Sequence, residues 1–334
     1  MAANGETLVL WEEDPGRYQA VFRDEEQGWT EPQTIAEVGQ NEFADLSMAS
    51  DGSAIFAVVR EVEGQRSIFA ALRPPGGAFG PLQRIPTTTE SIEGLAIAAG
   101  RGGQAVVTWP GFCHPFDPER RDPAYASFLN SLGTFGLPEK VPSSKCETGG
   151  LKVAMADSGE SVLLIDGSIR RTLGGVRASA RPPGGSFERA RFISDPAAGG
   201  AEIGMDGDGR ATAVWNLDAA GTEYSVRPPG GGFASPQRLN APASAGPLDE
   251  RGLSVNRRGD SVVVWQSTNT YRLKAAYASG GKRFGPAEKV SPRLPADVLT
   301  DVAITVSPNG KALAAWAKTR LGSETRGLYV ARRR

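Results

Sequence analysis

The stretch Arg73-Pro74-Pro75-Gly76-Gly77-Ala78-Phe79 decides the fold, because the chain repeats it. The pattern returns as RPPGGSF over residues 181–187 and as RPPGGGF over residues 227–233. Proline fixes φ and removes a backbone donor, and glycine readily adopts positive φ, so the motif predicts a tight turn between two strands. An aromatic residue closes each copy, and we expect it to pack beneath the turn. Looser copies close with Trp29, Phe135 and Phe284.

A second motif gives the period of the repeat. A glycine followed six residues later by a large apolar residue occurs at Gly5/Trp11, Gly52/Val58, Gly103/Trp109, Gly159/Ile165, Gly209/Trp215, Gly259/Trp265 and Gly310/Trp316. Successive glycines are about 50 residues apart, a period typical of repeat architectures. The motif also contains five of the six tryptophans.

One unit, residues 44–85, shows what is repeated. The expected strands are residues 44–49, 54–59, 67–72 and 82–85, with a polar loop over residues 61–65. Four antiparallel strands without helical spacing are typical of a propeller blade. We therefore predict an all-β propeller that fills residues 1–334 as a single domain. Seven blades are expected, with six as the alternative, and both end units are incomplete.

Composition limits the classes of partner. The formal net charge is −1, so the chain has no overall basic field for nucleic acid or an anionic membrane. No apolar run approaches the ~20 residues of a membrane span. The N-terminal sequence MAANGET has neither the basic start nor the apolar stretch of a signal peptide, so either the protein stays inside the cell or a leader has been removed. We expect a monomer.

The repeat resembles the propeller repeats of sialidases (bacterial neuraminidases). A strand, a glycine turn, an apolar strand ending in Trp, a third strand and a Gly-x-aromatic turn follow in that order. The family's turn is the Asp-box, whose aspartate is replaced here by proline in three copies. The resemblance implies a propeller over nearly the whole chain. Sialidase catalysis would need an arginine triad, a Tyr–Glu pair and an Asp, and the predicted inner strands carry no such set, so we assign no catalytic residue.

The longest insertion, residues 110–123, is the first candidate for binding, because long loops on rigid scaffolds often carry binding sites. It joins a second strand to a third strand, and charged residues of other units fall on the same face. A Pro-rich lid without a ligand, and an ordinary charged rim, are the alternatives. The candidate binding residues are Glu12, Asp14, Arg60, Glu61, Phe112, His114, Phe116, Asp117, Arg120, Arg121, Asp166, Arg170 and Arg171.

Metal and cofactor sites are not expected. His114 is the only histidine and lacks partners with ligand spacing. Asp206-Gly207-Asp208-Gly209 has the alternating carboxylates of a calcium loop, but it occupies the same place as the turn at Gly52, so we predict a turn. Arginines recur at one strand end and are expected to bond between blades. They are Arg23, Arg73, Arg181, Arg227 and Arg332.

Two functions follow from these residues. The first is a non-enzymatic binding module that recognises a glycan or a protein on the loop face. The second is a divergent sialidase-like glycoside hydrolase with Asp117, Glu119 or Asp166 as its acid, which would require two carboxyl groups a few ångströms apart. Because the inner strands offer no such pair, binding is the preferred function.

The two cysteines give a direct test of the loop arrangement. Cys113 lies in the long insertion and Cys146 in the adjacent blade-to-blade connection, so we predict a disulfide that staples the loop and an oxidising, extracellular location. A thiol reagent should label no cysteine in the unreduced protein and both after reduction. If both cysteines are labelled without reductant, the disulfide prediction is wrong and the alternative, two unrelated reduced cysteines, holds.

Overall fold

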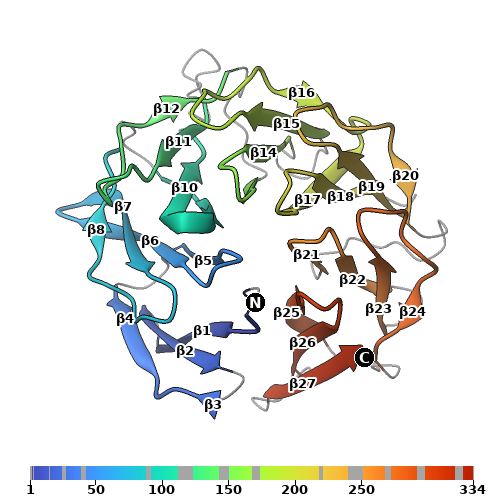
Figure 1. The fold of residues 1–334 in the computed structure, drawn as a ribbon, viewed down its shortest axis with the longest axis horizontal. Helices are drawn as coiled ribbons and strands as arrows, with labels where there is room; N and C mark the ends of the chain where they lie inside the picture. Colours follow the sequence, from blue (N-terminus) through green and yellow to red (C-terminus); the bar gives the residue numbers. More distant parts are fainter. Residues whose placement is uncertain are drawn as a thin grey trace. The chain divides into compact units, whose positions relative to one another are not determined.

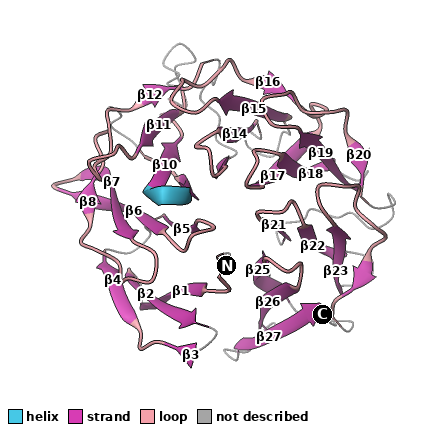
Figure 2. Cartoon of the chain, viewed as in Figure 1, coloured by secondary structure: helices cyan, strands magenta, loops and turns pink. Residues whose placement is uncertain are grey.

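The fold is seen in a computed structural model. It describes residues 2, 4–14, 16–24, 28–38, 43–87, 92–111, 123–142, 150–167, 174–217, 221–239, 251–267, 272–291, 298–319 and 326–333. These residues form antiparallel sheets (Figure 1). Helical structure within them is limited to a three-residue 3-10 turn at Arg101–Gly103 (Figure 2).

The chain divides into two compact units. Unit 1 comprises Met1–Arg170 and Arg177–Arg191, and unit 2 comprises Arg171–Val176 and Phe192–Arg334. Unit 1 holds the first three sheets and most of the fourth, and unit 2 holds the last three. We call the sheets blades 1 to 7 in chain order.

Four blades come first along the chain. Blade 1 contains β1 (Thr7–Asp14), β2 (Arg17–Asp24), β3 (Gly28–Trp29) and β4 (Gln33–Glu37). Blade 2 contains β5 (Ala44–Met48), β6 (Ala54–Val62), β7 (Gln65–Arg73) and β8 (Gln83–Arg84). Blade 3 contains β9 (Ala96–Gly100), β10 (Gln104–Trp109), β11 (Tyr125–Phe128) and β12 (Glu139–Lys140). Blade 4 contains β13 (Leu151–Met155), β14 (Ser161–Asp166), β15 (Val176–Arg181) and β16 (Arg191–Phe192).

Three blades follow. Blade 5 contains β17 (Ala198–Met205), β18 (Ala211–Leu217), β19 (Gly221–Arg227) and β20 (Gln237–Arg238). Blade 6 contains β21 (Arg251–Val255), β22 (Ser261–Ser267), β23 (Arg272–Ala278) and β24 (Glu288–Lys289). Blade 7 contains β25 (Val298–Val306), β26 (Ala312–Thr319) and β27 (Arg326–Arg333).

The predicted fold class is confirmed as an all-β, seven-bladed propeller, and the six-bladed alternative is wrong. The end blades are incomplete within the described residues. In blade 1, β1 pairs with β2 along nearly its whole length, so β3 and β4 follow one another on the other edge of β2. Blade 1 therefore begins at the second strand of the repeat, and blade 7 ends at the third.

The Pro-Pro-Gly-Gly motif forms a type II turn. In the first copy the N–H of Gly77 donates to the carbonyl of Pro74 at 3.0 Å, and Gly76 has φ of 67°. Pro75 supplies the fixed φ of the first central position, and Gly76 the positive φ of the second. The other two copies repeat this geometry, with φ of 66° at Gly184 and 63° at Gly230. The turn predicted from the sequence is confirmed.

The aromatic anchors differ among the copies. Phe79, Phe135 and Phe187 are buried beneath their turns, as expected. Trp29 is 54% exposed, so the prediction is wrong there. The reason is its position in the two-residue edge strand β3, where no further strand covers it.

The second turn of each blade is equally regular. In blade 2 the N–H of Ala49 donates to the carbonyl of Ser53 at 2.8 Å, and Gly52 donates back to Ala49 at 3.1 Å. Gly52 has φ of 88°, a conformation that glycine adopts without steric cost. The first-to-second strand turns and the third-to-fourth strand turns lie at the same end of a blade, as an antiparallel meander requires.

The second hairpin of blade 2 is longer than expected. β6 and β7 continue to Val62 and Gln65, so the predicted five-residue loop is a two-residue turn of Glu63 and Gly64. These residues have φ of 54° and 76°, which is type I′ geometry. The polar sequence around Glu61 concealed a strand that extends beyond the buried part of the blade.

The core lies between neighbouring blades. In unit 1, Ile55 and Ile68 of blade 2 pack with Val107 and Trp109 of blade 3 in one buried cluster. Glycines let the inner strands approach: a Cβ on Gly100 of β9 would lie 2.6 Å from the sulfur of Met155 in β13. Burial of a large apolar side chain contributes roughly 2–3 kcal/mol, so blade-to-blade packing is the main source of stability.

The blade 5 turn gives a matched test of the turn geometry. Gly230→Ala should cost about 1–2 kcal/mol of unfolding free energy, because φ is positive there. Gly231→Ala should cost about 1–3 kcal/mol, because its Cβ would lie 2.7 Å from Cγ of Pro228. Gly232→Ala, where no atom lies within 4 Å, is the control and should not destabilise the protein. Equal urea midpoints for all three variants would contradict the type II assignment.

Candidate functional site

Five of the predicted binding residues lie at one end of the second strand of their blades. Glu12 and Asp14 end β1, Arg60 and Glu61 are near the end of β6, and Asp166 ends β14. This end is opposite to the Pro-Pro-Gly-Gly turns. That this strand end forms a binding face stays a prediction.

Local contacts hold several of these side chains. Glu12 Oε1 accepts a hydrogen bond from the Gly16 N–H at 2.6 Å, which stabilises the β1–β2 hairpin. The Arg60 guanidinium carbon lies 5.9 Å from the centre of the Phe69 ring. Asp166 is 5% exposed, so its carboxyl group faces the protein rather than solvent.

The remaining predicted residues lie outside the described part of the chain, and their roles stay predictions. They are Phe112, Cys113, His114, Phe116, Asp117, Glu119, Arg120, Arg121, Cys146, Arg170 and Arg171.

The possible calcium loop is a turn. Asp206 Oδ1 accepts hydrogen bonds from the N–H groups of Asp208 at 3.1 Å and Arg210 at 2.8 Å. Burial raises the pKa of the Asp206 carboxyl, and the hydrogen bond from the Arg210 N–H opposes that shift.

Among the described residues, no group of three or more His, Cys, Asp or Glu side chains could hold a metal ion. No described helix is long and apolar enough to cross a membrane.

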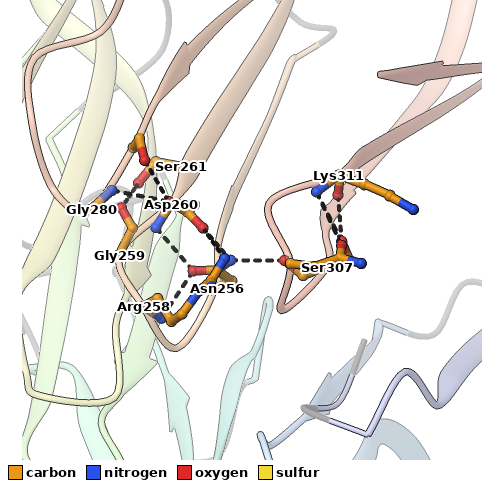
Figure 3. Close-up of polar contacts among 10 residues, drawn as sticks. Asn256, Arg258, Gly259, Asp260, Ser261, Gly280, Ser307 and Lys311 are labelled. Carbon is orange, nitrogen blue, oxygen red and sulfur yellow. Dashed lines mark hydrogen bonds and ion pairs between the residues drawn. The ribbon is translucent and has the colours of Figure 1, made fainter. Parts of the chain in front are cut away.

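The equivalent turn of blade 6 carries a buried polar network (Figure 3). Asn256 Nδ2 donates to Asp260 Oδ2 at 2.9 Å and to the Ser307 carbonyl of blade 7 at 2.8 Å. Asp260 Oδ1 accepts hydrogen bonds from the Ser279 hydroxyl and the Gly280 N–H, both at 3.0 Å. Burial acts to raise the pKa of Asp260, but the hydrogen bonds, that of Asn256 first, hold it below the usual value. The network joins two blades and is structural.

A repeated arginine lies over an aromatic ring of the preceding blade, and we call this pair the wedge. The guanidinium carbon is 4.0 Å from the ring centre for Arg73 over Phe22, and 3.5 Å for Arg181 over Phe128. Each such contact contributes about 0.5–2 kcal/mol. Arg73 also donates to the Gly52 carbonyl at 2.7 Å and pairs with the buried carboxylate of Glu6 in blade 1.

In blade 7 the wedge is made by Arg333, which lies 4.1 Å over the ring of Tyr277. The assignment of this position to Arg332 was wrong by one residue. β26 pairs Ala312 with Arg333, just as β6 pairs Ala54 with Arg73. A shift of one residue turns a side chain to the other face of a strand, so Arg332 cannot take this place.

The wedge is missing between blades 2 and 3. Ala105 of blade 3 is equivalent to Ala54 of blade 2, because each follows its turn glycine by two residues. Ala54 pairs with Arg73, whereas the Ala105 carbonyl accepts the Leu129 N–H at 2.9 Å. Leu129 therefore occupies the arginine position. Leu72, the residue before Arg73, replaces the aromatic ring that Phe22 and Phe128 provide elsewhere.

A cavity of about 410 Å³ lies at this junction. Its lining includes the half-buried aliphatic residues Leu72, Ala99 and Leu129 and the polar residues Ser53, Asn130 and Ser131. The gap remains because Ser53 is short. The junction of blades 5 and 6 also lacks a wedge. There the residue equivalent to Ser53 is the longer Arg210, whose Cδ would lie 2.6 Å from a Cβ on Gly281.

Sequence reasoning missed this cavity. The signal was an interruption in the arginine series: the third unit has Leu129 and then Asn130-Ser131-Leu132-Gly133, where three other units have Arg and then Pro-Pro-Gly-Gly. As a sequence, this stretch reads only as a looser copy of the turn. It lies at the blade end opposite to the predicted loop face.

No protein-family model and no curated protein matches the chain. Solved structures do match it. An ulvan lyase, a polysaccharide lyase bound to a GlcA–Rha3S oligosaccharide, is 10% identical with a TM-score of 0.63, covering 98% of this chain and 90% of its own. The fucose-specific lectin of Aleuria aurantia is 12% identical with a TM-score of 0.51, covering 89% and 95%.

A prolyl endopeptidase is 14% identical with a TM-score of 0.55 and covers 100% of this chain. This chain spans about half of its length, 49%. At these identities the likeness establishes the propeller fold, and a fold hosts many functions.

The Asn256 network predicts a pH-dependent variant. Asn256→Asp would replace a 2.9 Å hydrogen bond by two facing carboxylates, which should cost about 2 kcal/mol near pH 7. The paired carboxyls then have raised folded-state pKa values, so stability should increase as the pH falls toward about 4. Wild type should show the opposite sign there, because the lowered Asp260 pKa stabilises the fold only above the ordinary Asp value.

Urea unfolding at both pH values measures the difference. Asn309→Asp adds the same charge to an exposed position of the blade 7 turn and is the control. A destabilisation of Asn256→Asp that does not change with pH would contradict the paired-carboxylate argument.

Proposed function

We propose that the protein is a non-enzymatic propeller module that binds a glycan. The observation that carries this proposal is the cavity between blades 2 and 3, which is lined by aliphatic residues, among them Leu72 and Leu129, and by the polar residues Asn130 and Ser131. Sugars present C–H faces beside hydroxyl groups, and small-molecule sites combine the same two kinds of surface.

Two of the solved structures support the choice of ligand class. One matching propeller is named a fucose-specific lectin, and others are named polysaccharide lyases. These names belong to those proteins, and we extend only the ligand class to this chain. A protein partner on the loop face formed by Glu12, Arg60 and the residue 110–123 insertion remains the second form of the binding proposal. A monomer in an extracellular compartment, stabilised by a Cys113–Cys146 disulfide, fits either form.

The sialidase-like repeat remains a hypothesis about descent. It rests on the glycine and aromatic positions of the turns. The alternative function is a glycoside hydrolase, whose acid would be Asp166, or Asp117 or Glu119 of the insertion. A retaining hydrolase would require two such carboxyls about 5–5.5 Å apart.

A glycan array and a fluorogenic sialoside assay test the proposal together. We expect saturable binding to one class of glycan and no release of the fluorophore. The Asp166→Ala variant is the matched control for the assay. Hydrolysis that is present in the wild type and lost in Asp166→Ala would replace the binding module by the hydrolase, and an array without any bound glycan would overturn glycan binding.

A further inference from the structure

We infer that the free edge of β1 binds an extended peptide segment of a partner protein, which completes blade 1 as its first strand. Among the described residues, β1 pairs with β2 alone, whereas the second strands of blades 2 to 7 pair on both edges. An unpaired strand edge offers its N–H and C=O groups to another strand. The site is distinct from the cavity of the proposed function and does not depend on it.

Two leucines of β1 lack the cover that a first strand provides. Leu8 and Leu10 pack against the buried cluster shared with blade 2, yet both are only half-buried. Counted from the turn glycine, their equivalents in blade 2 are Ile55 and Ala57, which are 0% exposed. The equivalents in blades 3 to 6 are buried too, and they are Val106, Thr108, Val162, Leu164, Thr212, Val214, Val262 and Val264. An added strand would bury Leu8 and Leu10 in the same way.

The turn before β1 fixes the place and direction of the added strand. The Ala2 N–H donates to the Glu6 carbonyl at 2.8 Å, just as the Ala49 N–H donates to the Ser53 carbonyl at 2.8 Å between β5 and β6. The two turns are equivalent, so the added strand runs antiparallel to β1 and ends just before Ala2. It would span five residues, the length of β5 (Ala44–Met48).

Contacts between first strands specify one side chain of the peptide. Ser47 Oγ of blade 2 accepts the Ala99 N–H of blade 3 at 3.0 Å. In unit 2 the contact recurs, because Ser254 Oγ of blade 6 accepts the Val306 N–H of blade 7 at 3.1 Å. The equivalent donor in blade 2 is the Met48 N–H, and no side chain of the described residues accepts it. A serine, or another acceptor, at the fourth position of the peptide strand would accept this N–H.

Charge favours a basic residue directly before the peptide strand. In blade 2 the Val59 N–H donates to the Phe43 carbonyl at 2.8 Å, so the residue before β5 lies across from Val59. Glu12 is the equivalent of Val59 in blade 1 and is exposed. Residues 1–43 contain ten acidic and two basic residues. A lysine or arginine before the peptide strand would face Glu12, and opposite charges on facing strands are stabilising.

These contacts together define the partner segment. It is an extended peptide in which a basic residue precedes five residues of alternating apolar and acceptor side chains. β5 itself has this alternation, as Ala44-Asp45-Leu46-Ser47-Met48. In strand addition the main-chain hydrogen bonds supply affinity, and the alternate side chains supply specificity.

A peptide with this pattern tests the site on the full chain. The probe is Lys-Ala-Asp-Leu-Ser-Met-Ala, and its binding is measured by calorimetry. In blade 3, the N–H groups of Ile97 and Ala99 bond to side chains of β5 and so point away from β10. By equivalence, the probe amides that face β1 are those of its Asp and Ser. N-methylation of these two amides should abolish binding, whereas N-methylation of the Leu and Met amides should leave it intact.

Hydrogen exchange locates the bound peptide. We expect the probe to slow amide exchange within β1, while exchange within β6, whose two edges are already paired, stays unchanged. Slower exchange elsewhere without any change in β1 would place the peptide at another site and overturn the inference.

A fused strand should block the site. Placing Ala-Asp-Leu-Ser directly before Met1 supplies the strand within the chain, because Met1-Ala2 would then continue it as Met48-Ala49 continues β5. The fused chain should not bind the probe, and its circular dichroism should remain that of a β-sheet protein. Its glycan-array binding should equal that of the wild type, which separates this site from the proposed function.

Two matched substitutions test the charge pairing and also decide the outcome if the fused chain does not fold. Glu12→Gln keeps an amide oxygen to accept the Gly16 N–H but removes the charge, so it should weaken probe binding about twofold to fivefold. Glu31→Gln makes the same change at an exposed position of blade 1 and should bind as the wild type does.

Three results would overturn the inference. They are a wild type that does not bind the probe, equal binding of the two N-methylated peptides, and a fused chain that folds and still binds. Sedimentation of the chain alone tests the source of the strand, and we expect a monomer. A dimer that the probe dissociates would replace the partner protein by a second copy of this chain.

Discussion

The fit between a turn glycine and a side chain of the preceding blade is the contact on which the blade packing depends. A Cβ on Gly52 would lie 2.6 Å from Glu6 Oε2, and one on Gly159 would lie 2.4 Å from Gln104 Oε1. In unit 2, a Cβ on Gly310 would lie 3.3 Å from Asp260 Oδ2. Positive φ and this close approach both require glycine. The regular glycine period is therefore imposed by packing between blades as well as by the turn itself.

The blade junctions differ in how they are closed. Where Arg73 meets Phe22, the junction is closed by a cation over a ring and by a buried ion pair with Glu6. Where leucines occupy both positions, at Leu72 and Leu129, the same backbone leaves a cavity. A repeat architecture can acquire a cavity in this way by losing a structural pair at one junction, without any change of fold.

The sequence predicted the blades well because each turn is a local feature. Gly52 and the Pro-Pro-Gly-Gly copies specify their own backbone geometry, and alternation specifies the strands. The candidate site was harder to predict, because a cavity depends on side chains that meet from different blades. Leu129 and Ser53 are ordinary residues in the sequence, and only their shared junction gives them meaning. The error of one residue at Arg332 has a similar cause, since strand register is set by pairing across the sheet.

The type II turns have a consequence for how the chain folds. Their prolines restrict the unfolded chain, and the following glycine readily accepts the required φ, so each of these turns prefers its final shape before distant contacts form. The hairpins that they close join segments that are near in sequence, which lowers the entropy cost of bringing the strands together. Several places along the chain can thus begin the process on equal terms, and nucleation does not depend on one particular blade.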